Sequence, residues 1–194
     1  MTADSQTVRD QAVMRLRELA ELANKAADEL PDRITEAASL VREVLAHGGT
    51  LFFCGNGGSA ADAQHIATEY VVRYMRNRRA MAAIALTTDT SLLTAAANDL
   101  GFEHVFSRQV EALVRPGDLL VVHSTSGTSP NVIRAAESAR KRGAKVLALT
   151  ARDGGPLRSL ADVAIVIPTE RTDRAQELHL AIQHVICEMV EADA

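Results

Sequence analysis

Two segments of the chain carry histidine, glutamate and glutamine at helical spacing, and these residue types can hold a metal ion or move protons. His65 and Glu69 are four residues apart, so on a helix they project from one face. Gln176 and His184 lie in a second helical segment near the C-terminus. Two imidazoles, a carboxylate and a carboxamide form a mixed nitrogen and oxygen ligand set, for which zinc is the natural candidate. The alternative is that each histidine has only a structural role.

The spacing of Gln176 and His184 limits how they can share one ion. Eight residues of helix rise about 12 Å. The two side chains therefore reach a common ion only if they lean together or if the helix begins late. Otherwise different subunits contribute them.

A glycine-rich loop, Gly55-Asn56-Gly57-Gly58-Ser59-Ala60, follows an apolar run and precedes the helical segment of His65. It satisfies G-x-G-x-x-A, which is typical of dinucleotide binding. That fingerprint also needs an acidic residue about 20 positions later, and residues 73–80 (RYMRNRRA) contain none. The remaining interpretations are a phosphate-binding loop and a tight turn into a helix.

A second loop, Ser124-Thr125-Ser126-Gly127-Thr128-Ser129, follows the apolar run DLLVVH, and Pro130 can begin the next helix. Its hydroxyls and the free N–H groups of a helix N-terminus can hold a phosphate. The alternative is a solvated turn with an N-cap. Two such loops at one edge of a sheet favour a phosphorylated small molecule as ligand.

The elements that position these loops are strands alternating with helices. Residues 7–46 predict two helices broken near Pro31, and short apolar runs predict buried strands at 50–54, 82–86, 118–123, 145–150 and 163–168. Helical stretches begin near Ser59, Ser91, Glu103, Asn131 and Pro156, and the last covers 173–191. This pattern predicts an α/β fold with a doubly wound, five-stranded parallel sheet. Residues 1–47 form an N-terminal helical extension and residues 48–194 the α/β unit.

Composition limits the partners and the location. The 194 residues are 47% hydrophobic with a net charge of −4, so no basic surplus is present for binding nucleic acid or an anionic membrane. Cys54 and Cys187 lie in apolar runs without CxxC spacing, which favours reduced core thiols. No apolar run approaches the ~20 residues that span a bilayer. We expect a cytoplasmic protein that binds neither nucleic acid nor membrane.

Several longer motifs together resemble the phosphoheptose isomerases of the sugar isomerase (SIS) domain family. They are GNGGSAADAQH (55–65), HIATE (65–69), AND (97–99), FSRQVEAL (106–113), STSGTSPNV (124–132), LTARDGG (149–155) and DRAQELH (173–179) with His184 beyond. The resemblance covers nearly the whole chain. It implies a flavodoxin-like or Rossmann-like SIS domain, a homotetramer assembled through the N-terminal helices, and active sites between subunits.

The resemblance also implies an activity and residue roles. The family converts sedoheptulose 7-phosphate into an aldose, D-glycero-D-manno-heptose 7-phosphate, through an enediol, for surface glycans. Glu69 would be the base and His184 the acid, and one zinc ion would be held by His65, Glu69, Gln176 and His184. The phosphate would be bound by Ser124, Thr125, Ser126 and Ser129, and the sugar by Asn56, Gly57, Gly58, Ser59, Asn98, Asp99 and Gln176, with Arg73 and Asp173 in supporting positions.

The chain departs from the family pattern at two positions. Many relatives have two adjacent acidic residues where this chain has Thr68-Glu69, and a small or apolar residue in place of His123. His123 is either a harmless strand-end residue or a change in what is bound. Two other SIS-domain functions compete with the isomerase: a replication-initiator-associating adaptor, which generally lacks the equivalents of Glu69 and His184, and a sugar-phosphate-sensing regulator, which would need a DNA-binding segment.

Overall fold

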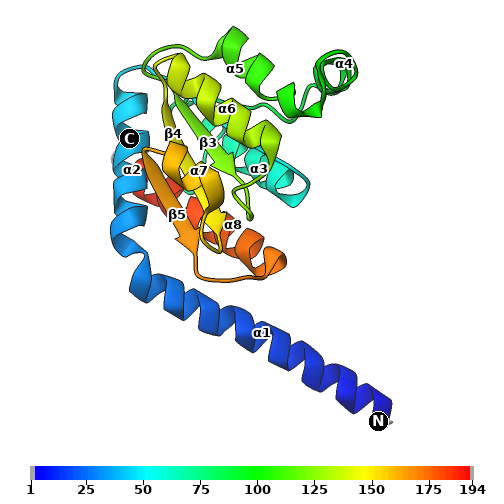
Figure 1. The fold of residues 1–194 in the computed structure, drawn as a ribbon. Coiled ribbons are helices and arrows are strands. Elements are labelled where there is room, and N and C mark those ends of the chain that lie inside the picture. The colour runs from blue at the N-terminus through cyan, green and yellow to red at the C-terminus, as the bar shows by residue number, and fades with distance from the viewer. Residues whose placement is uncertain (1–2, 193–194) are drawn as a thin grey trace.

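A five-stranded parallel sheet forms the centre of the computed structural model, which describes residues 3–192 (Figure 1). The strand order is β2-β1-β3-β4-β5, so the predicted doubly wound α/β fold is confirmed. The strands are β1 (Leu51–Gly55), β2 (Ala83–Ala85), β3 (Leu119–His123), β4 (Lys145–Ala151) and β5 (Val163–Ile167). The helices are α1 (Ala3–Glu29), α2 (Pro31–Ala46), α3 (Gly58–Val71), α4 (Thr90–Leu100), α5 (Ser107–Leu113), α6 (Pro130–Lys141), α7 (Gly155–Leu160) and α8 (Thr172–Glu191).

The strand order reverses at β1, because β2 lies on one side of it and β3 on the other. Gly55 and His123, the last residues of β1 and β3, are partners in the register. The loops that follow them therefore leave the sheet side by side. In an open parallel sheet this switch point is where ligands bind.

Alternate residues of the strands pack into two separate hydrophobic cores, one on each face of the sheet. On one face Phe53 packs with residues of α2, α3 and α8, and on the other Phe52 packs with residues of α4, α5, α6 and α7. Burial on both faces explains why the strands are continuous apolar runs rather than alternating ones.

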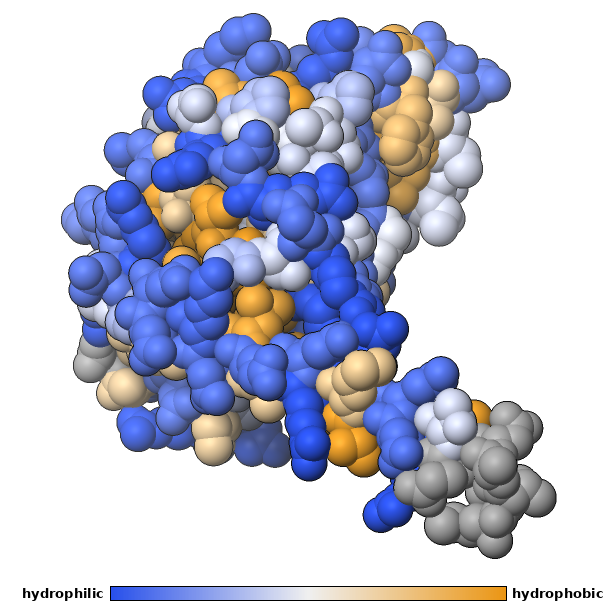
Figure 2. Space-filling model, turned by 60° about the horizontal axis from the view of Figure 1, so that its bottom comes forward, coloured by the Kyte–Doolittle hydropathy of each residue, from blue (hydrophilic) through white to orange (hydrophobic). Residues whose placement is uncertain are grey.

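The N-terminal extension consists of two helices that meet at Pro31. Proline is accommodated at the first turn of α2, because its missing N–H would have no helical partner there. α1 passes the start of α8, where Arg174 Nη2 donates a hydrogen bond to the Arg15 carbonyl (2.8 Å), and then continues beyond the body (Figure 1). Val8 and Leu16 are 60% and 69% exposed on it. In Figure 2 apolar residues interrupt an otherwise hydrophilic surface on this helix and on the body.

Two smaller predictions have different outcomes. The helix expected to begin near Glu103 begins at Ser107, because residues 102–104 form a separate 3-10 turn whose hydrogen bonds return to Gly101 and Phe102. Both cysteines are buried and free, as predicted. Within residues 3–192, no helix has the length and apolar character needed to cross a membrane.

Candidate active site

Helices α3 and α8 lie side by side and run in the same direction. Gln176, near the start of α8, packs against Gly58 at the start of α3. Further along, His184 contacts His65. At the far end Glu191 binds the backbone just beyond α3. This parallel pairing places the two chemically interesting helical segments of the sequence against each other.

Three of the four predicted metal ligands form one cluster between these helices. The Nε2 atoms of His65 and His184 are 2.9 Å apart, and Glu69 Oε1 lies 3.3 Å from His65 Nε2. One nitrogen or oxygen from each of the three residues lies within 4.8 Å of those of the other two. Two imidazole nitrogens and a carboxylate oxygen converging in this way fit a zinc ion.

The fourth predicted ligand, Gln176, lies nearer the N-terminal ends of α3 and α8 than the other three. A Cβ at Gly58 would lie 2.7 Å from Gln176 Oε1, so the amide packs directly on the glycine backbone. Gly58 precedes His65 by seven residues, about 10 Å of helix. The separation predicted from the sequence is therefore present in the structure.

Tyr74 completes the surroundings of His184. Its ring stacks on the imidazole, with centroids 5.3 Å apart and planes at 17°. Burial lowers the pKa of His184, and the neighbouring His65 lowers it further, while Glu69 opposes the shift. A neutral His184 keeps a nitrogen lone pair available for a metal ion or a proton.

Glu191 fixes the segment that carries Tyr74. Its buried carboxylate accepts hydrogen bonds from the backbone N–H groups of Tyr74 (3.1 Å), Met75 (2.7 Å) and Arg76 (2.7 Å). The buried guanidinium of Arg78 lies 3.2 Å from the same carboxylate and also donates to the Glu69 carbonyl (2.7 Å). These hydrogen bonds lower the pKa of Glu191 against the opposing effect of burial. One carboxylate thus joins the end of α8 to the segment after α3.

The two small-residue loops meet at the switch point, as predicted. Asn56 and Asn131 exchange two amide hydrogen bonds of 2.9 and 2.8 Å, which join the loop after β1 to the start of α6. A cavity of ≈280 Å³ opens here. Its lining includes Asn56, Ser129 and Asn131. Gly57, with φ +57°, makes the turn into α3, and Ser59 is buried behind it.

The serine-rich loop after β3 is shaped by contacts within itself and with β4. Ser124 is buried, and its Oγ accepts a hydrogen bond from Gly127 N (3.2 Å). Gly127 has φ +63°, and a Cβ there would overlap the Gly154 carbonyl. Ser129 is the N-cap of α6 but makes no side-chain capping hydrogen bond. Capping therefore does not occupy its hydroxyl, and the N-terminus of α6 faces the loop.

The remaining predicted residues lie outside this cavity. Asn98 and Asp99 are exposed on α4 and bond to each other (2.7 Å). Arg73 is exposed directly after α3. Asp173, in the first turn of α8, is held by Arg171 through contacts of 2.6 and 3.1 Å, and these hydrogen bonds lower its pKa to about 2. None of these four residues lines the cavity beside Asn56.

Three residues near the site were not singled out from the sequence. Asn131 is the amide partner of Asn56, and Tyr74 stacks on His184. Asp62 lies one turn before His65, and its buried Oδ2 has no hydrogen-bond partner among residues 3–192. Burial raises the pKa of Asp62. Asp62 was recognisable from its i, i+3 spacing to His65, whereas the other two depend on tertiary contacts.

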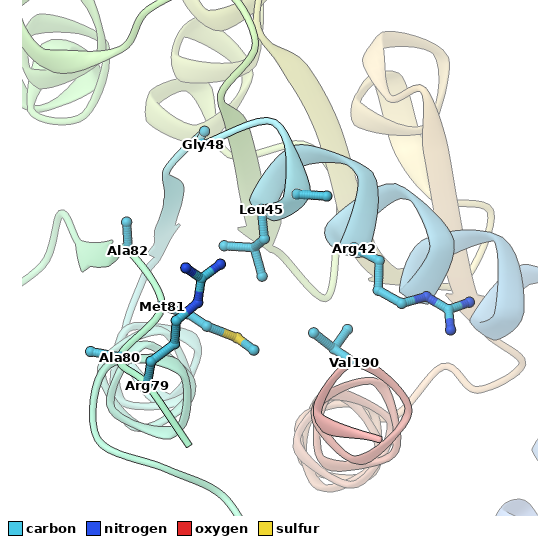
Figure 3. A pocket seen from close by; sticks show the side chains of 10 residues that line it. Arg42, Leu45, Gly48, Arg79, Ala80, Met81, Ala82 and Val190 are labelled. Carbon is cyan, nitrogen blue, oxygen red and sulfur yellow. The ribbon is translucent and has the colours of Figure 1, made fainter. Parts of the chain in front are cut away.

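A larger cavity lies elsewhere, at the edge of the sheet where β1 and β2 begin (Figure 3). It has a volume of ≈640 Å³ and an apolar lining that includes Leu45, Met81 and Val190, with Arg42 and Arg79 at its margin. None of the predicted site residues lines it. Its size therefore does not make it the active site.

Comparison with known families agrees with this geometry. The SIS domain family matches residues 16–151 of the chain. This match includes both loops of the switch point and the His65–Glu69 pair.

Individual relatives agree as well. The phosphoheptose isomerase of Chlorobaculum parvum is 55% identical over 89% of this chain and 84% of its own length. The structure of phosphoheptose isomerase GmhA from Neisseria gonorrhoeae is 44% identical, covers 95% of this chain and 99% of its own, and superposes with a TM-score of 0.90. A phosphoheptose isomerase from Francisella tularensis is 33% identical, with 99% and 100% coverage and a TM-score of 0.92.

Proposed function

Because the chain belongs to the SIS domain family and, within it, to the phosphoheptose isomerases, we propose that it converts sedoheptulose 7-phosphate into D-glycero-D-manno-heptose 7-phosphate. The product would supply activated heptose for surface glycans. The observation that carries the proposal is the convergence of His65, Glu69 and His184 beside the paired loops of the switch point. The adaptor interpretation is not favoured, because the relatives named above are isomerases and both Glu69 and His184 are present.

A zinc ion is the proposed cofactor, held by His65, Glu69 and His184 with Gln176 as the fourth ligand. The mutual spacing of the first three ligand atoms supports this assignment. Gln176 lies on the same helix as His184, and its amide packs on Gly58 at the start of the helix that carries His65 and Glu69. When bound, zinc acts as a Lewis acid that polarises the sugar carbonyl.

The proton transfers fall to Glu69 and His184. One carboxylate oxygen of Glu69 faces His65, which leaves the other to take the proton from C1 of the ketose. His184 gives a proton to the carbonyl oxygen at C2, and the enediol forms. Glu69 then returns its proton to C2 while His184 takes the proton of the O1 hydroxyl, so the carbonyl moves to C1 and both side chains regain their starting protonation. Tyr74 keeps the His184 ring in place during these steps.

The loops bind the two ends of the substrate. Ser124, Thr125, Ser126 and Ser129 would hold the phosphate at the N-terminus of α6, where the helix dipole favours an anion. Asn56, Gly57, Gly58 and Ser59 would line the sugar. Two observations support this arrangement: the Ser129 hydroxyl makes no capping hydrogen bond, and a cavity lies beside Asn56.

The proposed assembly is a cytoplasmic homotetramer with active sites between subunits. Residues 1–47 would serve assembly and residues 48–194 the reaction. The exposed apolar residues of α1 support a subunit contact. Arg73, Asn98, Asp99 and Asp173, which lie outside the cavity of their own chain, would act at a neighbouring subunit's site or support the site from outside.

Proton NMR in deuterated water tests the proposed reaction directly. Purified protein with zinc is incubated with sedoheptulose 7-phosphate, and the spectra are followed for aldose anomeric signals and for loss of signal at the carbon next to the carbonyl. We expect both, because the transferred proton exchanges with solvent. If zinc-loaded protein produces neither spectral change, the isomerase hypothesis is contradicted, and a sugar-phosphate-binding protein is the alternative.

A further inference from the structure

His123 is a buried polar residue at the end of an apolar strand. Residues 119–122 of β3 are apolar and buried, and His123 itself is 0% exposed, with its ring centroid 6.4 Å from that of Phe53. The next residue, Ser124, begins the serine-rich loop. Any contact that fixes His123 therefore also fixes the start of that loop.

The partner of His123 lies on α8. Gln183 Nε2 is 3.0 Å from His123 Nε2, and Gln183 is 1% exposed. The residue after Gln183 is His184. One buried hydrogen bond thus connects the residue before the phosphate loop to the residue before the proposed acid.

The protonation state of His123 determines which group donates this hydrogen bond. Burial lowers the pKa of His123 to about 3, so the ring is neutral at pH 7. With the amide orientation assigned to Gln183, its N–H donates to His123 Nε2, and the single ring proton of His123 lies on Nδ1. That Nδ1 is buried and has no protein partner within residues 3–192. Gln183 therefore supplies the hydrogen bond made by this imidazole.

Apolar contacts alone would hold α8 less specifically. Leu178, Ile182 and Ile186 pack on the same face of the sheet. Apolar cores tolerate small rearrangements and lose uniqueness before they lose stability. A buried hydrogen bond adds little net stability but requires one geometry. A second buried hydrogen bond, from His179 Nε2 of α8 to the Thr150 carbonyl of β4 (3.0 Å), acts in the same way. The His123–Gln183 contact is the one that sets the position of α8 relative to the end of β3.

We propose that His123 and Gln183 are positioning residues, whose hydrogen bond holds the phosphate-binding loop at a fixed separation from His184. The inference rests on the proposed function, in which that loop binds the phosphate and His184 acts on the sugar oxygens. It answers the question that His123 raised in the sequence: the histidine acts with a partner on the helix that carries His184.

A double substitution separates positioning from stability. His123→Leu and Gln183→Leu each leave one buried polar group without a partner, so both single variants lose stability. The double variant replaces both groups with apolar ones, and we expect its melting temperature to recover toward that of the wild type. Its kcat should nevertheless stay roughly tenfold low, because a small misplacement of reacting groups is costly. Its affinity for inorganic phosphate should be unchanged, because the loop itself is intact.

Gln109→Leu is the matched control. Gln109 is also a buried glutamine, but its amide donates to the Leu86 and Val105 carbonyls on the opposite face of the sheet. This variant should lose stability while the folded fraction keeps the wild-type kcat. A folded Gln109→Leu enzyme with the same tenfold loss would refute the specific role of the His123–Gln183 pair.

The order of measurements keeps the two proposals distinct. Wild-type turnover of sedoheptulose 7-phosphate is measured first, and its absence would refute the proposed function and the positioning role together. An active wild type with an equally active double variant would refute the positioning role alone. An active wild type, a stable but slow double variant and unchanged phosphate affinity would support it.

Discussion

Tyr74 and His184 stack with nearly parallel rings, 5.3 Å between centroids and 17° between planes. The phenol hydroxyl is not needed for this contact, but the ring is. We expect Tyr74→Phe to retain kcat within about twofold and Tyr74→Ala to lower it about tenfold, because His184 then loses its orientation. Steady-state kinetics of the three proteins is the measurement. Equal rates for Tyr74→Ala and the wild type would show that His184 needs no such support.

Glu69 should be indispensable for turnover but not for binding. Glu69→Gln keeps the shape of the side chain and removes its basicity, so kcat should fall by at least about a thousandfold while sugar phosphate still binds. Isothermal titration with substrate beside the NMR assay measures both. Undiminished turnover would exclude Glu69 as the base.

Metal removal should abolish turnover reversibly. Chelation should stop the reaction, and zinc should restore it, if the His65–Glu69–His184 cluster is the metal site. His65→Asn should weaken zinc retention at least about tenfold, because a direct ligand is lost. Elemental analysis after dialysis measures retention, with His104→Asn as a control histidine outside the cluster. Active protein that contains no zinc would overturn the assignment.

Acid should destabilise the fold through buried histidines. Burial lowers the pKa of His123 to about 3 and of His179 to about 4, both below the usual 6.5. Between pH 7 and 5 the unfolded chain therefore binds protons at these histidines, whereas the folded chain does not. As the pH falls over this range, the free energy of unfolding decreases by about 1–2 kcal/mol for each ring. Denaturant midpoints at fixed protein concentration measure this. His123→Leu should show a shallower fall, whatever its stability at pH 7; an unchanged slope would mean that His123 is protonated in the folded state.

The tight contact of Gly127 with the loop after β4 leaves no room for a side chain. Gly127→Ala must displace the backbone of Gly154 or the serine loop, so we expect phosphate affinity to drop at least about tenfold. Gly117→Ala is the control, because Gly117 has a similar positive φ (+92°) with nothing within 4 Å of a Cβ. Equal phosphate affinity in both variants would argue against the serine loop as the phosphate site.

Local patterns predict the sheet and its loops well, because strands buried on both faces leave uninterrupted apolar runs. The i, i+4 spacing of His65 and Glu69 likewise predicts a shared face. The arrangement of α3 beside α8 was not predictable from either segment, since it depends on where the sheet places the two helices. Tyr74 and Glu191 belong to the site only through that arrangement. Spacing did not predict that Gln176 and His184 act on one substrate. The resemblance implies it, and it stays a prediction.

The N-terminal helix also has a consequence for how far this protein can be shortened. Arg171, the N-cap residue of α8, binds Asp173 in the first turn of the helix and lies 2.9 Å from Glu18 of α1. The buried Arg174 donates to the Arg15 carbonyl. A chain trimmed to begin at Pro31 would keep every proposed catalytic residue. It would nevertheless lose Glu18 and the Arg15 carbonyl, which are acceptors for two arginines that lie within two residues of Asp173. Although α1 extends away from the body, it therefore helps to hold the start of α8 in place.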